Sequence, residues 1–301
     1  MVIPQTAILA QATAPGSGLM QDISLFQAFV IGVVQGLTEF LPISSTAHVK
    51  MVPVVLGWGD PGVAFTAVIQ LGSIAAILWY FWADLSGVVK GMVRAVLQRD
   101  YAAQDFRLGL GILLGTIPIV LGGLLIKLFI PDFDNSPLRS SSTIAIVSII
   151  MALLLAGAEI VSKHKRPFAD LNLKDGVIMG LAQTLALIPG VSRSGSTLTA
   201  GLFMDLERST AARFSFLLGI PAITLAGLVE MKDSLKTGLD TTAGWAPLAV
   251  GLVTALVVSY LAIFWLLRFL KQHSTWIFVW YRLAFGLAIL VAIATGKMQN
   301  L

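Results

Sequence analysis

The sequence predicts an all-α polytopic membrane protein, with six transmembrane helices and two re-entrant helix-loop-helix segments arranged as inverted-topology repeats. The first reason is composition: of 301 residues, 56% are hydrophobic and 12% are charged, and the mean hydropathy is +0.87. A soluble domain has roughly 25% charged residues, so this chain has too few charges to cover a soluble surface. The other two reasons are long charge-free runs and a pair of apolar runs interrupted by proline.

The long apolar runs define the spans. A helix that crosses a bilayer needs about 20 apolar residues. Six segments come close to or exceed this length, and the last of them contains an arginine, Arg282. We therefore expect transmembrane helices at residues 61–83, 108–126, 140–158, 214–229, 241–267 and 274–296.

Two further apolar segments are broken. Residues 23–52 hold Glu39 and are interrupted at Pro42, and residues 176–204 hold Arg193 and are interrupted at Pro189. Proline removes a backbone donor and clashes with the preceding turn of a helix. Each segment should therefore split into two half-helices that turn back inside the membrane, next to a charged side chain.

The charges of the loops predict which way the spans run. Lys and Arg are concentrated at 84–107, 162–174 and 268–271, whereas 127–139 and 231–244 carry two basic residues each. Cytoplasmic loops are enriched in Lys and Arg, so we expect the first three loops in the cytoplasm and the other two outside. The two broken segments then enter the membrane from opposite faces.

This arrangement divides the chain into two inverted halves. Each half has one broken segment and three spans, and an odd number of spans inverts the second half relative to the first. The predicted units are 23–161 and 174–296, after an N-terminal extension at 1–22 that we expect to be disordered. The run Gly32 to Leu37 also resembles the run Gly180 to Leu185, with glutamine at the fourth position of both.

The first break carries a carboxylate, hydroxyls and an imidazole. Gln35 and Glu39 are four residues apart and share one helix face. A charge at bilayer depth is costly, so Glu39 should have a partner or a function. The polar residues that follow Pro42 are Ser44, Ser45, Thr46 and His48.

The second break is a Gly/Ser turn that leads into a helix. Free N–H groups and the dipole at a helix start bind phosphate, and the planar fork of an arginine suits phosphate oxygens. We therefore expect an oxyanion as the ligand. The candidate residues are Ser192, Arg193, Ser194, Gly195 and Thr197.

Other interpretations of these residues stay open. Serine and glycine can serve only close packing between membrane helices. Glu39 and Arg193 can form a structural ion pair, and His48 can be a buried histidine with satisfied hydrogen bonds. Arg282 either binds phosphate or extends to the membrane surface. The two intramembrane charges beside clustered hydroxyls favour catalysis.

Composition excludes several classes of function. The chain has no cysteine, which excludes disulfides, thiol nucleophiles and thiolate metal sites, and three histidines are too few for a His-rich metal centre. The net charge of +4 comes from short loops between spans, so we expect no nucleic-acid partner.

The two motifs resemble those of the undecaprenyl-diphosphate phosphatase family, the bacitracin-resistance type. The family motif (Glu/Gln)-x-x-x-Glu, followed by Pro-x-Ser-Ser-Thr-x-His, matches Gln35 to His48. The motif Pro-Gly-x-Ser-Arg-Ser-Gly-x-Thr matches Pro189 to Thr197. The similarity covers about residues 24–296. Because the first acidic position is Gln35 here, this motif lacks a two-carboxylate metal site.

The resemblance implies an enzyme that removes the terminal phosphate of undecaprenyl diphosphate at the outer face of the bacterial inner membrane. This reaction recycles the lipid carrier for cell-wall synthesis. The implied partners are the polyprenyl diphosphate and the bilayer, a homodimer stays open, and a divalent cation, Mg²⁺ or Ca²⁺, would bind at Glu39. The catalytic candidates are Glu39, Ser45, His48 and Arg193, and the phosphate-binding candidates are Gln35, Ser44, Thr46, Ser192, Ser194, Gly195, Thr197 and Arg282.

Two alternatives remain for the chemistry and the class. The nucleophile is Ser45, His48 or water. The rival class is a transporter or flippase of a polyprenyl phosphate lipid, because secondary transporters typically have broken helices and inverted repeats. The other membrane phosphatase superfamily is excluded, because no histidine follows Ser192-Arg193 until His273.

Overall fold

The computed structural model is all-helical over the residues it describes, which are 23–130, 133, 136–236, 244–298 and 300. The described residues form no β-strand, and an isolated β-bridge joins Arg166 and Leu206. The expected disorder of residues 1–22 lies outside the described residues.

Five helices in the described part are long and apolar enough to cross a membrane. They overlap five of the expected spans, and a bent pair of helices, α3 and α4, supplies a sixth if the pair counts as one span. The five are α5 (Gln104–Phe129), α6 (Ser141–Val161), α9 (Arg208–Lys236), α10 (Trp245–Phe269) and α11 (Trp276–Ala294).

The bent pair corrects one expectation from the loop charges. Helix α3 (Val63–Tyr80) is followed after one residue by α4 (Trp82–Gln98), at an angle of 64°. Most of the segment expected to be a loop at 84–107 is therefore helical. Lys90 and Arg94 do not end the helix because they lie on its exposed side, whereas Val88 and Ala95 are buried.

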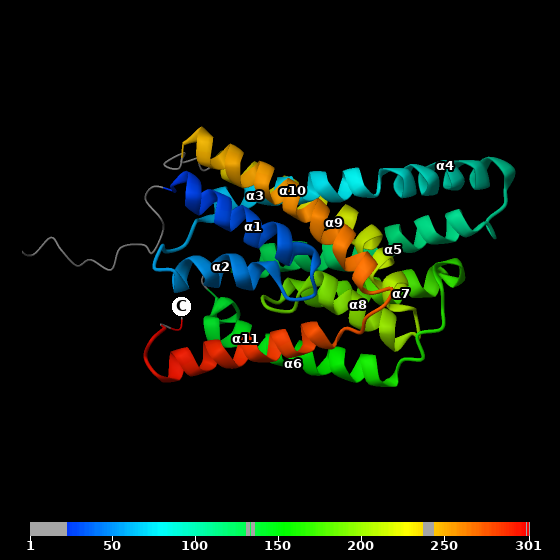
Figure 1. Ribbon diagram of the computed structural model, residues 1–301. Helices are drawn as coiled ribbons and strands as arrows, with labels where there is room; N and C mark the ends of the chain where they lie inside the picture. The colour runs from blue at the N-terminus through cyan, green and yellow to red at the C-terminus, as the bar shows by residue number, and fades with distance from the viewer. Residues whose placement is uncertain (1–22, 131–132, 134–135, 237–243, 299, 301) are drawn as a thin grey trace, which may run out of the picture.

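Both broken segments split at the expected places. Helix α1 (Leu25–Phe40) ends before Pro42 and α2 (Ser45–Val55) begins after it. Helix α7 (Leu173–Thr184) and the short 3₁₀ turn η5 (Leu185–Leu187) come before Pro189, and α8 (Arg193–Phe203) follows. The two helical hairpins open toward opposite ends of the molecule, α1–α2 to the left in Figure 1 and α7–α8 to the right.

The two hairpins begin alike and pack alike. Ser24 and Asn172 each form a capping box at the start of α1 and α7. Helix α1 packs on α10, and α7 packs on α5. A Cβ atom on Gly32 of α1 would meet the Gly251 carbonyl of α10 at 2.6 Å, and one on Gly180 of α7 would overlap the backbone of Gly115 in α5. Glycine thus permits both close helix contacts.

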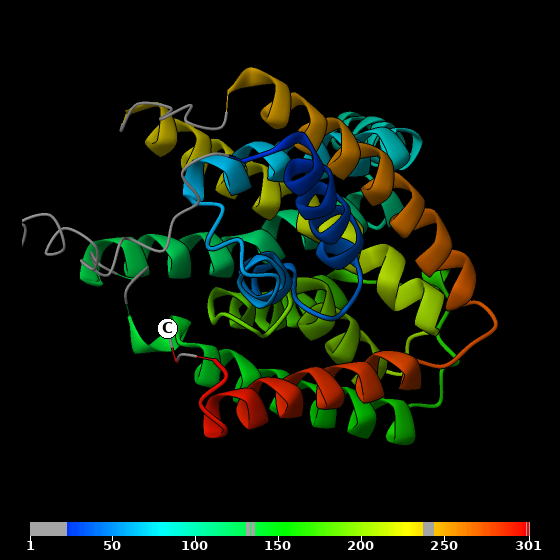
Figure 2. The same cartoon turned by 60° about the vertical axis from the view of Figure 1, so that its left-hand side comes forward.

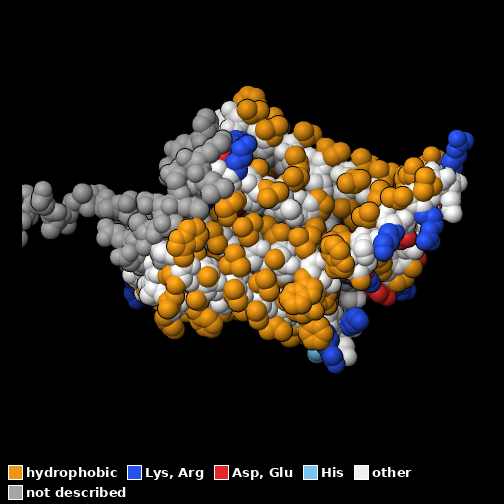
Figure 3. All heavy atoms as spheres, turned by 90° about the horizontal axis from the view of Figure 1, so that it is seen from above, with side chains coloured by type: hydrophobic (Ala, Val, Ile, Leu, Met, Phe, Trp, Pro, Cys, Tyr) orange, Lys and Arg blue, Asp and Glu red, His pale blue; other side chains and the backbone are white. Residues whose placement is uncertain are grey.

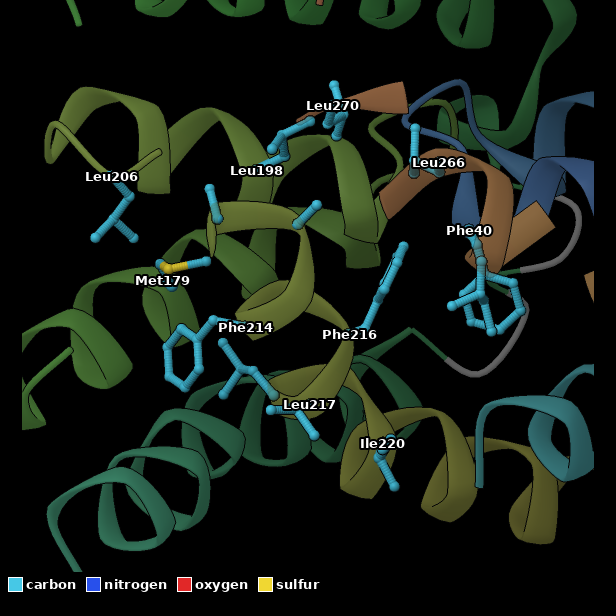
Figure 4. Packing of buried hydrophobic residues seen from close by; sticks show 14 of the residues in the cluster. Phe40, Met179, Leu198, Leu206, Phe214, Phe216, Leu217, Ile220, Leu266 and Leu270 are labelled. Carbon is cyan, nitrogen blue, oxygen red and sulfur yellow. The ribbon is translucent and has the colours of Figure 1, made fainter. Parts of the chain in front are cut away.

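Helices α6 and α11 lie side by side and complete the bundle (Figure 2). A buried core around α8 and α9 includes Phe40, Leu198, Phe214 and Phe216 (Figure 4), and the Phe40 and Phe216 rings meet edge to face with centroids 5.5 Å apart. Hydrophobic side chains cover the middle of the surface in Figure 3, and most Lys and Arg side chains in this view gather at its right-hand end. A broad apolar band with a charged end is the surface of a membrane protein.

Candidate active site

The breaks in the two hairpins meet at one cavity of about 310 Å³. Apolar residues of α5, α9 and η5 form one wall of the cavity. Phe133, Arg139 and Glu230 also line it. Six of the residues predicted from sequence also line it, and they come from both breaks. These are Glu39, Ser44, Ser45, Thr46, Ser192 and Arg193.

Glu39 connects the residues of the first break with the arginine of the second. Its Oε2 atom accepts hydrogen bonds from the Ser45 hydroxyl at 2.8 Å and from the Gln35 amide at 3.2 Å. Its Oε1 atom lies 3.8 Å from Nη2 of Arg193. The two charged side chains are only 11% and 9% exposed. The predicted approach of Glu39 and Arg193 is therefore present in the structure.

The Arg193 side chain packs against helix α9 and lines the cavity. Its Nη1 atom donates to the Ser215 carbonyl at 3.5 Å and occupies the space where a Cβ of Gly219 would be. The buried atoms Nε and Nη2 have no hydrogen-bond partner in the described structure. Since unsatisfied buried donors cost about 1–3 kcal/mol each, these two N–H groups are suited to a ligand with strong acceptors.

Two serines occupy equivalent positions at the starts of α2 and α8. Ser44 and Ser192 are the N-cap residues and have positive φ angles of 76° and 72°. The Ser192 hydroxyl accepts a hydrogen bond from the Gly195 N–H at 3.1 Å. The buried Ser44 hydroxyl has no hydrogen-bond partner among the residues that the structure describes. Two helix N-termini therefore lie at the same cavity, and helix N-termini favour anions.

His48 lies behind the cavity and does not line it. Its Nδ1 atom is 2.7 Å from the Ser44 carbonyl oxygen, and its Nε2 atom is 2.7 Å from the Tyr281 hydroxyl. The imidazole also stacks on the Phe285 ring, with centroids 4.3 Å apart, and lies nearly parallel to the Tyr281 ring. Both ring nitrogens are thus engaged, and the bond to Ser44 holds the unusual backbone of that residue. The geometry favours a positioning role over the expected acid, base or nucleophile.

Arg282 differs most from its expected role. It is 1% exposed and donates to four backbone carbonyls, those of Pro42, Ser148, Gly190 and Val191. Pro42 belongs to the first break and the two last carbonyls to the second. The side chain neither lines the cavity nor extends to the surface. Arg282 instead ties the two breaks together by satisfying carbonyls that the interrupted helices leave open.

Four other predicted phosphate ligands form a layer behind the cavity. Gln35 supports Glu39, and the Ser194 hydroxyl donates to the Leu41 carbonyl at 3.1 Å. Gly195 faces Arg282, and the buried Thr197 hydroxyl bonds to the Arg193 carbonyl at 2.8 Å. Their hydrogen bonds fix the turn that presents Ser192 and Arg193. None of these four residues is among those that line the cavity.

Several residues of the site could not be found from the motifs. Gln70, Arg139 and Glu230 line the cavity from α3, the turn before α6, and α9. Ser215 and Gly219 accommodate Arg193 from within a predicted span. The one usable signal in the sequence was the polar residue Gln70 inside an otherwise apolar run.

An integral membrane protein with a polar cavity where two broken helical segments meet is the class that this fold and site define. Residues 28–288 match the family described as bacitracin resistance protein BacA. The chain belongs to this family.

Curated relatives are similar in sequence to this protein along nearly the whole chain. A protein of Nostoc sp. is 65% identical over 95% of this chain and 89% of its own length. One of Synechocystis sp. is 67% identical over 91% and 84%, and one of Synechococcus elongatus is 66% identical over 93% and 96%. All three are named undecaprenyl-diphosphatase.

Proposed function

We propose that this protein is an integral membrane phosphatase that hydrolyses undecaprenyl diphosphate to undecaprenyl phosphate and inorganic phosphate, and so recycles the lipid carrier for cell-wall synthesis. Membership of the bacitracin resistance family and the names of its relatives support this function. The observation that carries it is a set of unpartnered buried donors, from Ser44 and Arg193, facing the same cavity as a Ser45–Glu39 hydrogen bond.

The terminal phosphate is held by groups from both breaks. Arg193 offers Nε and Nη2, Ser44 offers its hydroxyl, and the first N–H groups of α2 and α8 add donors at two helix starts. In phosphoryl transfer, charge spreads over the three equatorial oxygens in the transition state, and fixed donors stabilise it. The donors are preorganised because Ser215, Gly219 and the layer behind them fix Arg193.

Ser45 and Glu39 supply the groups for attack. In the first scheme, Ser45 Oγ attacks the terminal phosphorus and gives its proton to Glu39, while the bond to the bridging oxygen breaks and undecaprenyl phosphate leaves. Water then hydrolyses the phosphoserine. In the second scheme, Glu39 takes the proton of a water that attacks directly, and Ser45 orients it. Trapping phosphate on Ser45 distinguishes the two schemes.

A divalent cation would be held mainly by Glu39. Hard cations such as Mg²⁺ are commonly bound by one or two carboxylates together with substrate phosphates. The described residues contain no group of three or more His, Asp or Glu side chains, but Glu39 and Glu230 both line the cavity. This donor set fits a cation that is completed by diphosphate oxygens. A bound Mg²⁺ or Ca²⁺ would offset the charge of the diphosphate.

The proposed membrane arrangement has two re-entrant hairpins in inverted repeats at 23–161 and 174–296. Three similarities between the halves support it. Helices α1 and α7 both begin with a capping box, and α2 and α8 both follow a serine with positive φ. The first helix of each hairpin also packs on a helix of the other half, α1 on α10 and α7 on α5. The cavity residues Phe133, Arg139 and Glu230 belong to the end with few basic loops. By the positive-inside rule, the cavity opens to the outer face of the inner membrane.

The function is tested by phosphate release from undecaprenyl diphosphate, using protein purified in detergent with and without a chelator. We expect release by the wild type, loss with chelator, and no release above background for Arg193→Ala. Arg94→Ala removes an exposed arginine of α4 and should retain full activity. Because detergent has no second compartment, a protein that only flips lipid would release no phosphate, and that result would exclude the phosphatase.

A further inference from the structure

A second and larger cavity, of about 830 Å³, lies at the end opposite the candidate active site. It is bounded by the α3–α4 bend, the loop around Phe168, the start of α9 and the end of α10. It shares no lining residue with the first cavity. The helices α3 and α4 meet at an angle of 64°, and Tyr80, Phe81 and Asp84 line the cavity from this bend.

The charges of this cavity leave two cations without partners. Three basic and two acidic side chains line it. Arg213 forms an ion pair with Asp84 and lies over the Phe168 ring at 4.4 Å from its centroid. Arg268 and Lys271, one turn apart at the end of α10, are exposed and have no ion pair among the described residues. Glu207 is the second acidic residue of the lining, so the cavity has a net excess of one positive charge, contributed by Arg268 and Lys271.

The cavity is also amphipathic and lies at an edge of the membrane. Helix α9 begins at Arg208 and α10 ends at Phe269, so Arg268 and Lys271 lie at the end of a candidate span, where we expect lipid head groups. Phe264, one turn deeper on α10, lines the same cavity and is 49% exposed, so the apolar wall continues into the outer surface of the protein. A ligand here should have an anionic head and an apolar body.

We propose that this cavity binds an anionic glycerophospholipid, with its phosphate at Arg268 and Lys271 and its acyl chains along Phe264. Basic pockets between transmembrane helices on the cytoplasmic side recognise anionic head groups in this way. The bound lipid would fill the space below the bend and hold α4 relative to α9 and α10. This role is separate from phosphate release at the other end of the molecule.

The test is lipid binding by native mass spectrometry of the full-length purified protein. The probes are phosphatidylglycerol, phosphatidylcholine with the same acyl chains, and inorganic phosphate. We expect one tightly bound phosphatidylglycerol, and binding at least about tenfold weaker in Arg268→Ala/Lys271→Ala, since each basic residue contributes about 1 kcal/mol to such binding. The matched control, Lys163→Ala/Lys165→Ala, removes two exposed lysines from the same end outside the cavity and should bind as the wild type does.

Three results would overturn this assignment. Equal weakening in both double variants would mean that only the general charge of this end attracts the lipid. Equal affinity for phosphatidylcholine would remove the role of the anionic head. Binding of inorganic phosphate with the affinity of the lipid would make the cavity a phosphate site. None of these readouts depends on catalysis, so the result is independent of the proposed phosphatase activity.

Discussion

Arg193 is kept in a buried position by a glycine on another helix. The Arg193 guanidinium occupies the place of a Gly219 side chain and bonds to the Ser215 carbonyl one turn earlier on α9. This fit leaves Nε and Nη2 without a hydrogen bond among the described residues, with Nη2 3.8 Å from the Glu39 carboxylate. Gly219 is therefore a positioning residue for Arg193, and the position cannot accept even a methyl group unless the arginine moves.

Gly219→Ala should lower kcat by at least about 100-fold, the usual cost of losing a donor to a developing oxyanion. The control Gly123→Ala places its Cβ 3.7 Å from Leu187, an ordinary contact, and should be nearly silent. In the Arg193→Ala background, which should release no phosphate, the comparison is made by binding of a non-hydrolysable diphosphate analogue, and Gly219→Ala should cause no additional loss of affinity because its effect acts through that side chain. Additive losses in the double variant would show that Gly219 acts by another route.

Sequence patterns located the residues at each break but not their directions. Glu39 and Arg193 were expected to meet because burial of each charge requires a partner, and they do. His48 and Arg282 were expected at the ligand, but the structure turns them toward Tyr281 and toward backbone carbonyls. Spacing along a chain does not determine which neighbouring helix a side chain faces. That depends on tertiary packing, here on α11.

At the scale of elements, the two broken segments depend on close helix contacts made by glycine. Helix α7 packs on α5 through Gly176 and Gly180, against Gly111 and Gly115. Close approach lets backbones touch and gains packing that longer side chains would prevent. These contacts fix the position of α7 against α5, and therefore the position of the break that follows α7 and carries Arg193.

Gly180→Ala should destabilise the protein by about 1–3 kcal/mol, because the added methyl group overlaps the Gly115 backbone, which cannot rotate away. The measurement is reversible unfolding in detergent. Gly87→Ala on α4 meets nothing within 4 Å and should be neutral or stabilising by up to about 1 kcal/mol, as expected for alanine in a helix. Equal stability of the two variants would contradict the close α5–α7 contact.

The existence of the elements was predictable, but the extent of one was not. Proline and length rules located the two breaks and five of the spans, and the sixth expected span corresponds to the bent pair α3–α4. The number of charges in 84–107 predicts a loop. Their spacing, however, places Lys90 and Arg94 on one exposed face of helix α4. Charge indicates which side of the membrane a segment lies on, and does not by itself end a helix.

For the whole molecule, the two cavities lie at opposite ends of one bundle. The candidate active site is lined from the left-hand end of Figure 1 and the larger cavity from the right-hand end, where the basic loops are. The distribution of Lys and Arg predicted these two ends from the sequence. The cavities themselves could not be predicted, because each is built by segments far apart in the chain.

The sidedness is testable because the chain has no cysteine, so single cysteines can be introduced without background. A membrane-impermeant maleimide added to intact spheroplasts should label Leu138→Cys, which is exposed at the end of the candidate active site. It should label Lys165→Cys, exposed in a basic loop, only after permeabilisation. The reverse pattern would place the active site on the cytoplasmic side.

The central claim is that the two breaks together form one diphosphate-binding site around Arg193 and Ser44. The most direct test is equilibrium binding of a non-hydrolysable polyprenyl methylenediphosphonate to the purified protein, since binding alone requires no chemistry. We expect binding by the wild type, and affinity lower by about 10- to 100-fold in Arg193→Ala and to a lesser degree in Ser44→Ala, as charged hydrogen bonds contribute more than neutral ones. Unchanged affinity in both variants, with the proteins still folded, would contradict the site.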